Sequence, residues 1–167
     1  MVTATYGMVG KDMTIGATEK TQDAASGAAP FDAYSGTLEI GNTNGTPATA
    51  AIVTGMDFTL TNSFAPTFVI GSDSAPQLEV GRAEIEGTIS AYFEDAALIN
   101  RFLNETETEL EVTVGDGSNT IKFAFPRAKI NSADVGVDGP TSRVISMSFV
   151  ALYNTADASN LVITRSA

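Results

Sequence analysis

Alternating polar and apolar residues run through most of the chain after residue 50 and predict β-strands. Met56, Phe58 and Leu60 alternate with polar neighbours, which is the period of a half-buried strand. The same period recurs over the longer segment Gln77–Phe93. Further strands are expected at Asp12–Ile15, Gly36–Ile40, Pro66–Ile70, Thr108–Val114, from Ile121 to near Pro126, at Arg143–Asn154 and at Leu161–Arg165. In the Arg143–Asn154 segment the alternation places Tyr153 on the buried face.

One segment has helical spacing instead. Leu98 and Phe102 lie four residues apart behind the acidic pair Glu94-Asp95, and acids in a first turn complement the helix dipole. We therefore expect one α-helix near residues 95–104. Together the elements predict a mostly β protein with two packed antiparallel sheets, as a sandwich or barrel, and this helix on its flank. The length predicts a single domain over residues 1–167, with a mobile loop at about 17–35 and turns at Asp116-Gly117 and Asp138–Pro140.

The chain is strongly acidic, with a formal net charge of −11. Binding of nucleic acid through its phosphates requires clustered lysine and arginine, so this charge argues against that class of protein. An acidic surface also repels anionic membranes, and no apolar run has the length of a membrane span. No membrane anchoring is expected.

Histidine and cysteine are both absent. The usual general base and the usual ligands of transition metals are therefore missing, and we expect no enzyme, no cofactor and no metal. Two alternatives remain open. One is a carboxylate enzyme that uses Glu84 and Glu86. The other is a carbohydrate- or calcium-binding β-sandwich whose loops Gly115–Gly117 and Asp134–Gly139 supply oxygen ligands.

Charge is distributed unevenly along the chain. Residues 77–116 carry ten acids and two bases, whereas residues 117–167 carry three acids and five bases. This division suits head-to-tail association of identical subunits, but the charges can equally pair across one hairpin, as Glu111 with Lys122. The candidate lumen or subunit-interface residues are the outward-facing acids and the C-terminal bases: Glu84, Glu86, Glu109, Glu111, Lys122, Arg127, Lys129 and Arg143.

Three segments resemble a known family. They are GRAEIEGTISAYFEDAALINRFLNETETELEV at residues 81–112, IKFAFPRAKI at 121–130 and ISMSFVALYN at 145–154. They look like the latter part of tail tube (major tail) proteins of long-tailed, non-contractile bacteriophages. In that family a strand with this glycine and aromatic pattern leads into a helix of this length, and a strand ending in an aromatic-Pro-Arg segment follows.

The resemblance implies a structural virion protein that self-assembles into hexameric rings, which stack into a hollow tube. Strands from each subunit would line a lumen through which DNA passes without specific binding. The implied partners are copies of the chain and the terminator, tip and tape measure proteins, in a virion tail assembled in the host cytoplasm. Acids at Glu84, Glu86, Glu109 and Glu111 would then repel phosphate or face a neighbouring subunit. The loop at 17–35 resembles segments that become ordered when rings stack.

Overall fold

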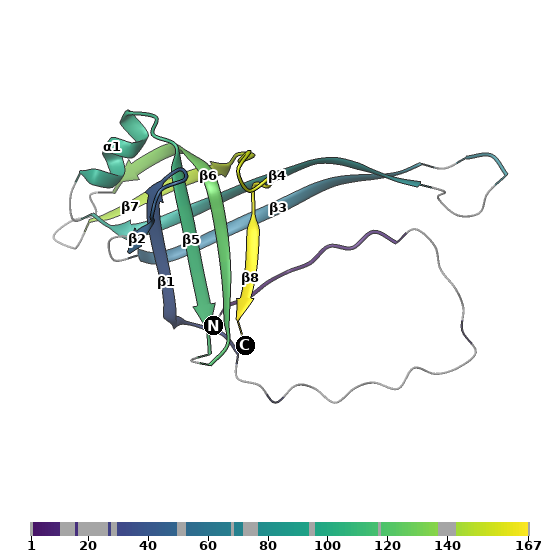
Figure 1. Cartoon of the computed structure of the whole chain (residues 1–167), viewed down its shortest axis with the longest axis horizontal. Helices are drawn as coiled ribbons and strands as arrows, with labels where there is room; N and C mark the ends of the chain where they lie inside the picture. The colour runs from purple at the N-terminus through teal and green to yellow at the C-terminus, as the bar shows by residue number, and fades with distance from the viewer. Residues whose placement is uncertain are drawn as a thin grey trace.

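The computed structural model describes residues 2–10, 16, 27, 30–49, 53–67, 69–71, 77–93, 96–116, 118–136 and 143–166. Within these ranges the chain forms eight strands and one short helix (Figure 1). Their bounds are β1 Asp32–Asn42, β2 Ala48–Thr49, β3 Val53–Thr67, β4 Gln77–Tyr92, α1 Ala97–Leu103, β5 Thr108–Gly115, β6 Thr120–Val135, β7 Val144–Ala151 and β8 Val162–Ser166. The expected mostly β fold with one helix is confirmed.

The described strands join one antiparallel sheet, so the two separate sheets of the prediction are not shown. Their order is β2-β1-β5-β6-β7-β4-β3, and β8 pairs with β6. Strand β6 is central, because its first half lies between β5 and β8 while its second half continues beside β7. Figure 1 shows β1, β5 and β8 running across the direction of β3 and β4. One long strand thus connects two differently oriented halves of the sheet.

The expectation that this strand ends near Pro126 is wrong, and the register gives the reason. Phe125 lies opposite Leu110, but Ala128 lies opposite Thr108, so β6 accommodates an extra residue within this step. A proline has no N–H to contribute to the ladder, and such an irregularity is where a strand tolerates one. The strand therefore continues past the proline and joins both halves.

The core lies between the two halves of the sheet. Phe58 of β3 contacts Phe125 and Phe123 of β6, with ring centroids 5.1 and 5.4 Å apart, although β3 and β6 are not neighbours in the sheet. Phe125 also meets Phe149 of β7 at 5.4 Å. Gly87 leaves room for this cluster, because a Cβ there would lie 2.6 Å from the Phe149 ring. The other large side chains that are fully buried are Ile85, Ile89, Leu110, Ile145, Met147 and Thr108.

Helix α1 is shorter than the predicted 95–104 and spans Ala97–Leu103. Its first turn contains no acid, and the acidic pair expected there lies outside the described residues. Leu98 and Phe102 pack against the core, as the spacing predicts. Arg101 donates a hydrogen bond of 3.2 Å to a backbone carbonyl at the end of β1, which fixes the helix to the sheet. No described helix has the length and apolar character to cross a membrane.

The aromatic side chains of Tyr153 and Tyr92 are exposed, and Tyr153 was expected on the buried face. Tyr153 is 58% exposed because β7 already ends at Ala151, so the alternation beyond that point no longer belongs to a paired strand. Tyr92, the last residue of β4, is 38% exposed. The expected loop at 17–35 overlaps β1, which begins at Asp32. The strand expected at Asp12–Ile15, the turn at Asp138–Pro140 and most of the loop lie outside the described residues.

Strands β3 and β4 continue beyond the rest of the sheet as a two-stranded ribbon. β4 pairs with β7 only from Ile85 onwards, whereas its pairing with β3 extends back to Gln77. Residues 62–67 and 77–83 are called the hairpin arm below, and Figure 1 shows the arm projecting away from the body. Phe64 on this arm is 44% exposed.

Asp116 closes the hairpin between β5 and β6, as expected for the Asp116-Gly117 turn, although Gly117 itself lies outside the described residues. Its carboxylate accepts hydrogen bonds from Asn119 N at 2.7 Å, Ser118 N at 2.9 Å and Asn119 Nδ2 at 3.0 Å. These hydrogen bonds lower the pKa of Asp116 to about 2, and the bond from the backbone N–H of Asn119 has the largest effect. Both carboxylate oxygens thus accept hydrogen bonds within the turn, as in an Asx turn. Asp116 therefore stabilises the turn and is not placed as a cation ligand.

Replacing Asp116 with alanine is expected to destabilise the fold at neutral pH. The folded pKa lies below the ordinary 3.8, so the carboxylate contributes fully above about pH 4, and this contribution is lost as the pH falls toward 2. The free energies of unfolding of the two proteins should differ at pH 7 and converge toward pH 2 in urea titrations. Asp134→Ala, which removes an exposed acid of β6, is the control. A difference that stays constant over this range would contradict the role of Asp116.

Candidate subunit and lumen surfaces

Three of the predicted bases already pair with acids of the same chain. The pairs, called the ion-pair ladder below, join β6 to the segment from the end of α1 to β5, and they are Lys122–Glu111 at 2.8 Å, Arg127–Glu107 at 3.0 Å and Lys129–Glu105 at 2.7 Å. Pairing within one hairpin, one of the two alternatives from the sequence, is thereby confirmed for Glu111 and Lys122. The contact is diagonal, because Lys122 stands directly opposite Thr113.

Glu105 and Glu107 were not among the predicted site residues. They follow the helix, where the alternation has not yet started, so the period of the strand does not single them out. A simple hairpin register would not have found their partners either. Counted back from the turn at Asp116, it places Glu107 opposite Ala128 and Glu105 opposite Ile130, whereas the extra residue in β6 shifts the alignment and the ion pairs form with Arg127 and Lys129.

The ladder holds its groups in their charged forms. Hydrogen bonds from Lys129 and Arg127 lower the pKa of Glu105 and of Glu107, respectively. The hydrogen bond with Glu111 raises the pKa of Lys122. Since these pairs lie at the surface, each contributes little to stability. Their larger effect is that three bases of β6 already have acidic partners.

Around Lys122 the surface holds more acid than base. Burial raises the pKa of Glu109, and the nearby charges of Glu111 and Asp157 raise it further. Glu39 of β1 stands directly opposite Glu111 of β5. In the described part of the chain no group of three or more acids is arranged to hold a metal ion. Lys122 therefore acts as the cation that this acidic surface requires.

Glu84 and Glu86 lie elsewhere on the sheet, because β6 and β7 separate β4 from β5. Both are exposed on the face opposite the buried Ile85, as the alternation predicts. Arg82 Nε is 4.0 Å from Glu84 Oε1, and both side chains are mostly exposed. The cross-strand register continues this face onto β3, β7 and β6. We call it the open acidic face: Asp57, Thr59, Glu84, Glu86, Thr88, Asp134, Ser146 and Ser148, with the bases Arg82, beside Glu84, and Lys129, opposite Val150, at its borders.

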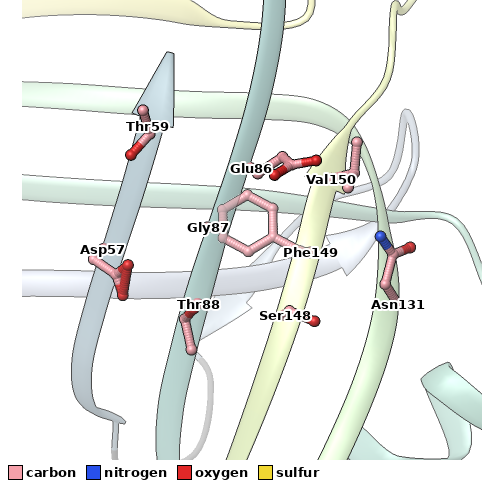
Figure 2. Close-up of a pocket in the computed structure, with 9 residues that line it drawn as sticks. All are labelled: Asp57, Thr59, Glu86, Gly87, Thr88, Asn131, Ser148, Phe149 and Val150. Carbon is pink, nitrogen blue, oxygen red and sulfur yellow. The ribbon is translucent and has the colours of Figure 1, made fainter. Parts of the chain in front are cut away.

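A shallow depression of about 340 Å³ lies on the open acidic face (Figure 2). Asp57 and Glu86 contribute carboxylates to its lining, and Thr59, Thr88 and Ser148 contribute hydroxyl groups. The lining contains no lysine or arginine. Such a surface stays hydrated and repels anions, and it offers no imidazole or amine to exchange protons near neutral pH.

The fourth predicted base, Arg143, lies apart from the ladder. It is exposed just before β7, and its backbone carbonyl accepts a hydrogen bond of 2.9 Å from Phe93 N. Its side chain forms no salt bridge with any described residue. The structure therefore divides the candidates into internally paired bases, the open acidic face and this exposed arginine.

The sequence also matches a known protein family. The sequence profile described as "Phage tail tube protein" matches residues 1–151. The chain belongs to the phage tail tube protein family. It is a tail tube subunit, a structural component of the virion tail and not an enzyme.

Solved tail structures share the fold of this tail tube protein at low sequence identity. The SPP1 tail tube has a TM-score of 0.61 and 11% identity, covering 82% of this chain and 80% of that chain. The tail of an empty gene transfer agent particle has a TM-score of 0.56 and 14% identity, covering 77% and 94%. The sheath–tube complex of the PVC extracellular contractile injection system has a TM-score of 0.53 and 9% identity, covering 82% and 93%. No curated protein sequence matches the chain.

Proposed function

We propose that this tail tube subunit closes into hexameric rings, which stack into a tube with the open acidic face lining the lumen. This proposal rests on the different distribution of charged side chains on β6 and on the open acidic face. The ladder pairs the bases of β6 within the chain, and the open acidic face carries an excess of carboxylates: the depression on it is lined by no base, Arg82 lies 4.0 Å from Glu84, and Lys129 at its border already pairs with Glu105. A wall with an excess of carboxylates repels phosphate, so DNA slides past it without binding. The gene transfer agent tail, which has a similar fold, was determined with C6 symmetry.

The edge of the sheet supports ring closure. Strand β3 has 15 residues and pairs in the described sheet with β4 alone, so its other edge can extend the sheet of a neighbouring subunit. Because β3 and β4 carry much of the open acidic face, such pairing makes that face continuous around a ring. In this arrangement the two halves of the sheet serve as two packed layers, an inner one with β3, β4 and β7 and an outer one with β1, β5 and β8.

The remaining candidates are proposed at contacts outside the lumen. Glu109, Glu111 and Lys122 lie in the outer layer, Lys129 lies beside β7 but is paired with Glu105, and Arg143 forms no salt bridge with a described residue and can meet an acid of a neighbouring subunit. The hairpin arm extends past the body, and its exposed Phe64 favours a contact with an adjacent ring. Terminator, tip and tape measure proteins would then meet the ends and interior of a tube that is assembled in the host cytoplasm from single-domain subunits.

Negative-stain electron microscopy of the purified protein, at high concentration and over a range of salt, tests the proposal. We expect six-fold rings or tubes with a central hole. Higher salt should favour them, because screening weakens repulsion between acidic subunits. Filaments without a hole, a symmetry other than six-fold, or monomers under every condition would contradict it.

A further inference from the structure

The N-terminal segment, residues 2–10, has the sequence of a strand but pairs with none of the described strands. Val2, Ala4, Tyr6 and Met8 alternate with small or polar residues. Such a period of two is typical of a strand with one buried face. In the structure the segment belongs to no strand of the described sheet, and all its residues are exposed. Tyr6 is 80% exposed and Met8 is 91% exposed.

The segment begins at the body and leads away from it. Val2 N donates a hydrogen bond of 3.0 Å to the carbonyl of Phe31, directly before β1. Figure 1 shows the segment running outward from there. It contains no charged residue, although the chain carries a net charge of −11, so it can approach an acidic subunit without repulsion. An uncharged, strand-patterned and exposed segment is suited to pairing with another chain.

Strand β8 offers an edge of matching size and character. In the described sheet β8 pairs with β6 alone, which leaves its other edge open. Ile163 on β8 stands opposite Phe123, whose ring contacts Phe58, so an apolar row ends at this edge. Ile163 is 59% exposed there. The five residues of β8 span about 17 Å and residues 2–8 span about 23 Å at ~3.3 Å per residue, so the segment can cover the whole edge.

We infer that residues 2–8 of one subunit add as a strand to the open edge of β8 in a neighbouring subunit. The apolar face of the added strand, with Tyr6 and Met8, covers Ile163 and extends the aromatic core into the contact. Backbone hydrogen bonds supply the affinity, and the alternation sets which side chains turn inward. This inference rests on the proposed assembly and names one of the contacts that hold copies together.

Cysteine cross-linking tests the pairing, because the chain has no cysteine of its own. Tubes are assembled from a mixture of two variants, one with Ile163→Cys and one with a single cysteine at residue 4, 6 or 8, and are then oxidised mildly. A disulfide requires Cα atoms within about 7 Å, so dimers that contain both variants are expected. The matched controls carry Thr3→Cys, Thr5→Cys or Gly7→Cys, which turn to the opposite face and should cross-link much less.

A second test uses Tyr6→Asp against Thr5→Asp, together with a variant that lacks residues 2–8. Residues 2–10 are exposed and belong to no part of the described core, so none of these variants should change the urea midpoint of the monomer. Tyr6→Asp and the truncation should raise the concentration required for assembly about tenfold or more, and Thr5→Asp should have less effect.

The outcomes separate this inference from the proposed function. Tubes that assemble from the cysteine variants without the mixed cross-link, or tubes that form equally well without residues 2–8, overturn the inference and leave the tube intact. A cross-link that forms within one doubly substituted chain in dilute monomer assigns the segment to its own β8, which also overturns it. Failure of the wild type to form rings or tubes at all overturns both.

Discussion

Replacing Phe125 with alanine is expected to lower the free energy of unfolding by about 3–5 kcal/mol. Phe125 is fully buried and contacts Phe58 and Phe149 edge-on, with ring centroids 5.1 and 5.4 Å apart. It brings β3, at one end of the sheet order, into contact with β6 at its centre, so its removal opens a cavity where the two halves meet. Single domains typically have about 5–15 kcal/mol of stability, so this loss would be a large fraction.

Urea unfolding followed by circular dichroism measures this effect, since the chain has no tryptophan to report by fluorescence. Phe64→Ala is the matched control, because the same side chain is removed from a position that is 44% exposed on the hairpin arm. We expect that control to cost about 1 kcal/mol or less in the isolated subunit. Equal losses for the two variants would show that the aromatic cluster is not the centre of the core.

Reversing Glu84 and Glu86 to lysine together is expected to leave folding and tube formation intact and to reduce infectivity at least tenfold. The change removes two carboxylates and adds two ammonium groups per subunit, a net change of +4 on a face that is proposed to line the lumen. Clustered lysines bind DNA phosphates through release of counterions, so the wall would retain the genome instead of repelling it. The measurement is complementation of a phage that lacks its own tail tube protein, with DNA ejection assayed on intact particles.

Single variants provide the controls for this experiment. Glu86→Lys and Glu79→Lys change the charge equally on the same strand, but Glu79 lies on the hairpin arm, outside the stretch of β4 that pairs with β7. Glu86→Lys should slow ejection, whereas Glu79→Lys should not. Normal tubes and normal ejection in the double variant would remove both acids from the lumen. Loss of rings in that variant would instead place them at a subunit contact.

The sequence predicts the strands and their buried faces well, because a period of two fixes which side chains share a face. It therefore placed Glu84 and Glu86 correctly on the side opposite Ile85. The alternation of polar and apolar residues does not show where a strand stops pairing with its neighbours. Tyr153 lies beyond the end of β7 and was therefore assigned to the wrong surface. It also cannot show that an irregularity at Pro126 lets one strand serve both halves of the sheet.

The sequence predicted most of the charged residues of the candidate site, but it did not predict which acid pairs with which base beyond Glu111 and Lys122. Glu111 and Lys122 were found because they flank one turn at short range. Glu105 and Glu107 were missed because their partners depend on the register of the hairpin across an extra residue in β6. Which surface meets a neighbouring subunit depends on groups in another chain, and no pattern within a single sequence specifies them.

The ion-pair ladder has a consequence for the subunit before it enters a tail. A newly synthesised tail protein is surrounded by replicating genomes and transcripts, which capture proteins that display rows of free cations. On β6 the cations Lys122, Arg127 and Lys129 are each neutralised by a carboxylate of the same molecule. To bind a phosphate, each would first have to give up that carboxylate. We therefore expect the free subunit to bind nucleic acid only weakly before it enters a tail.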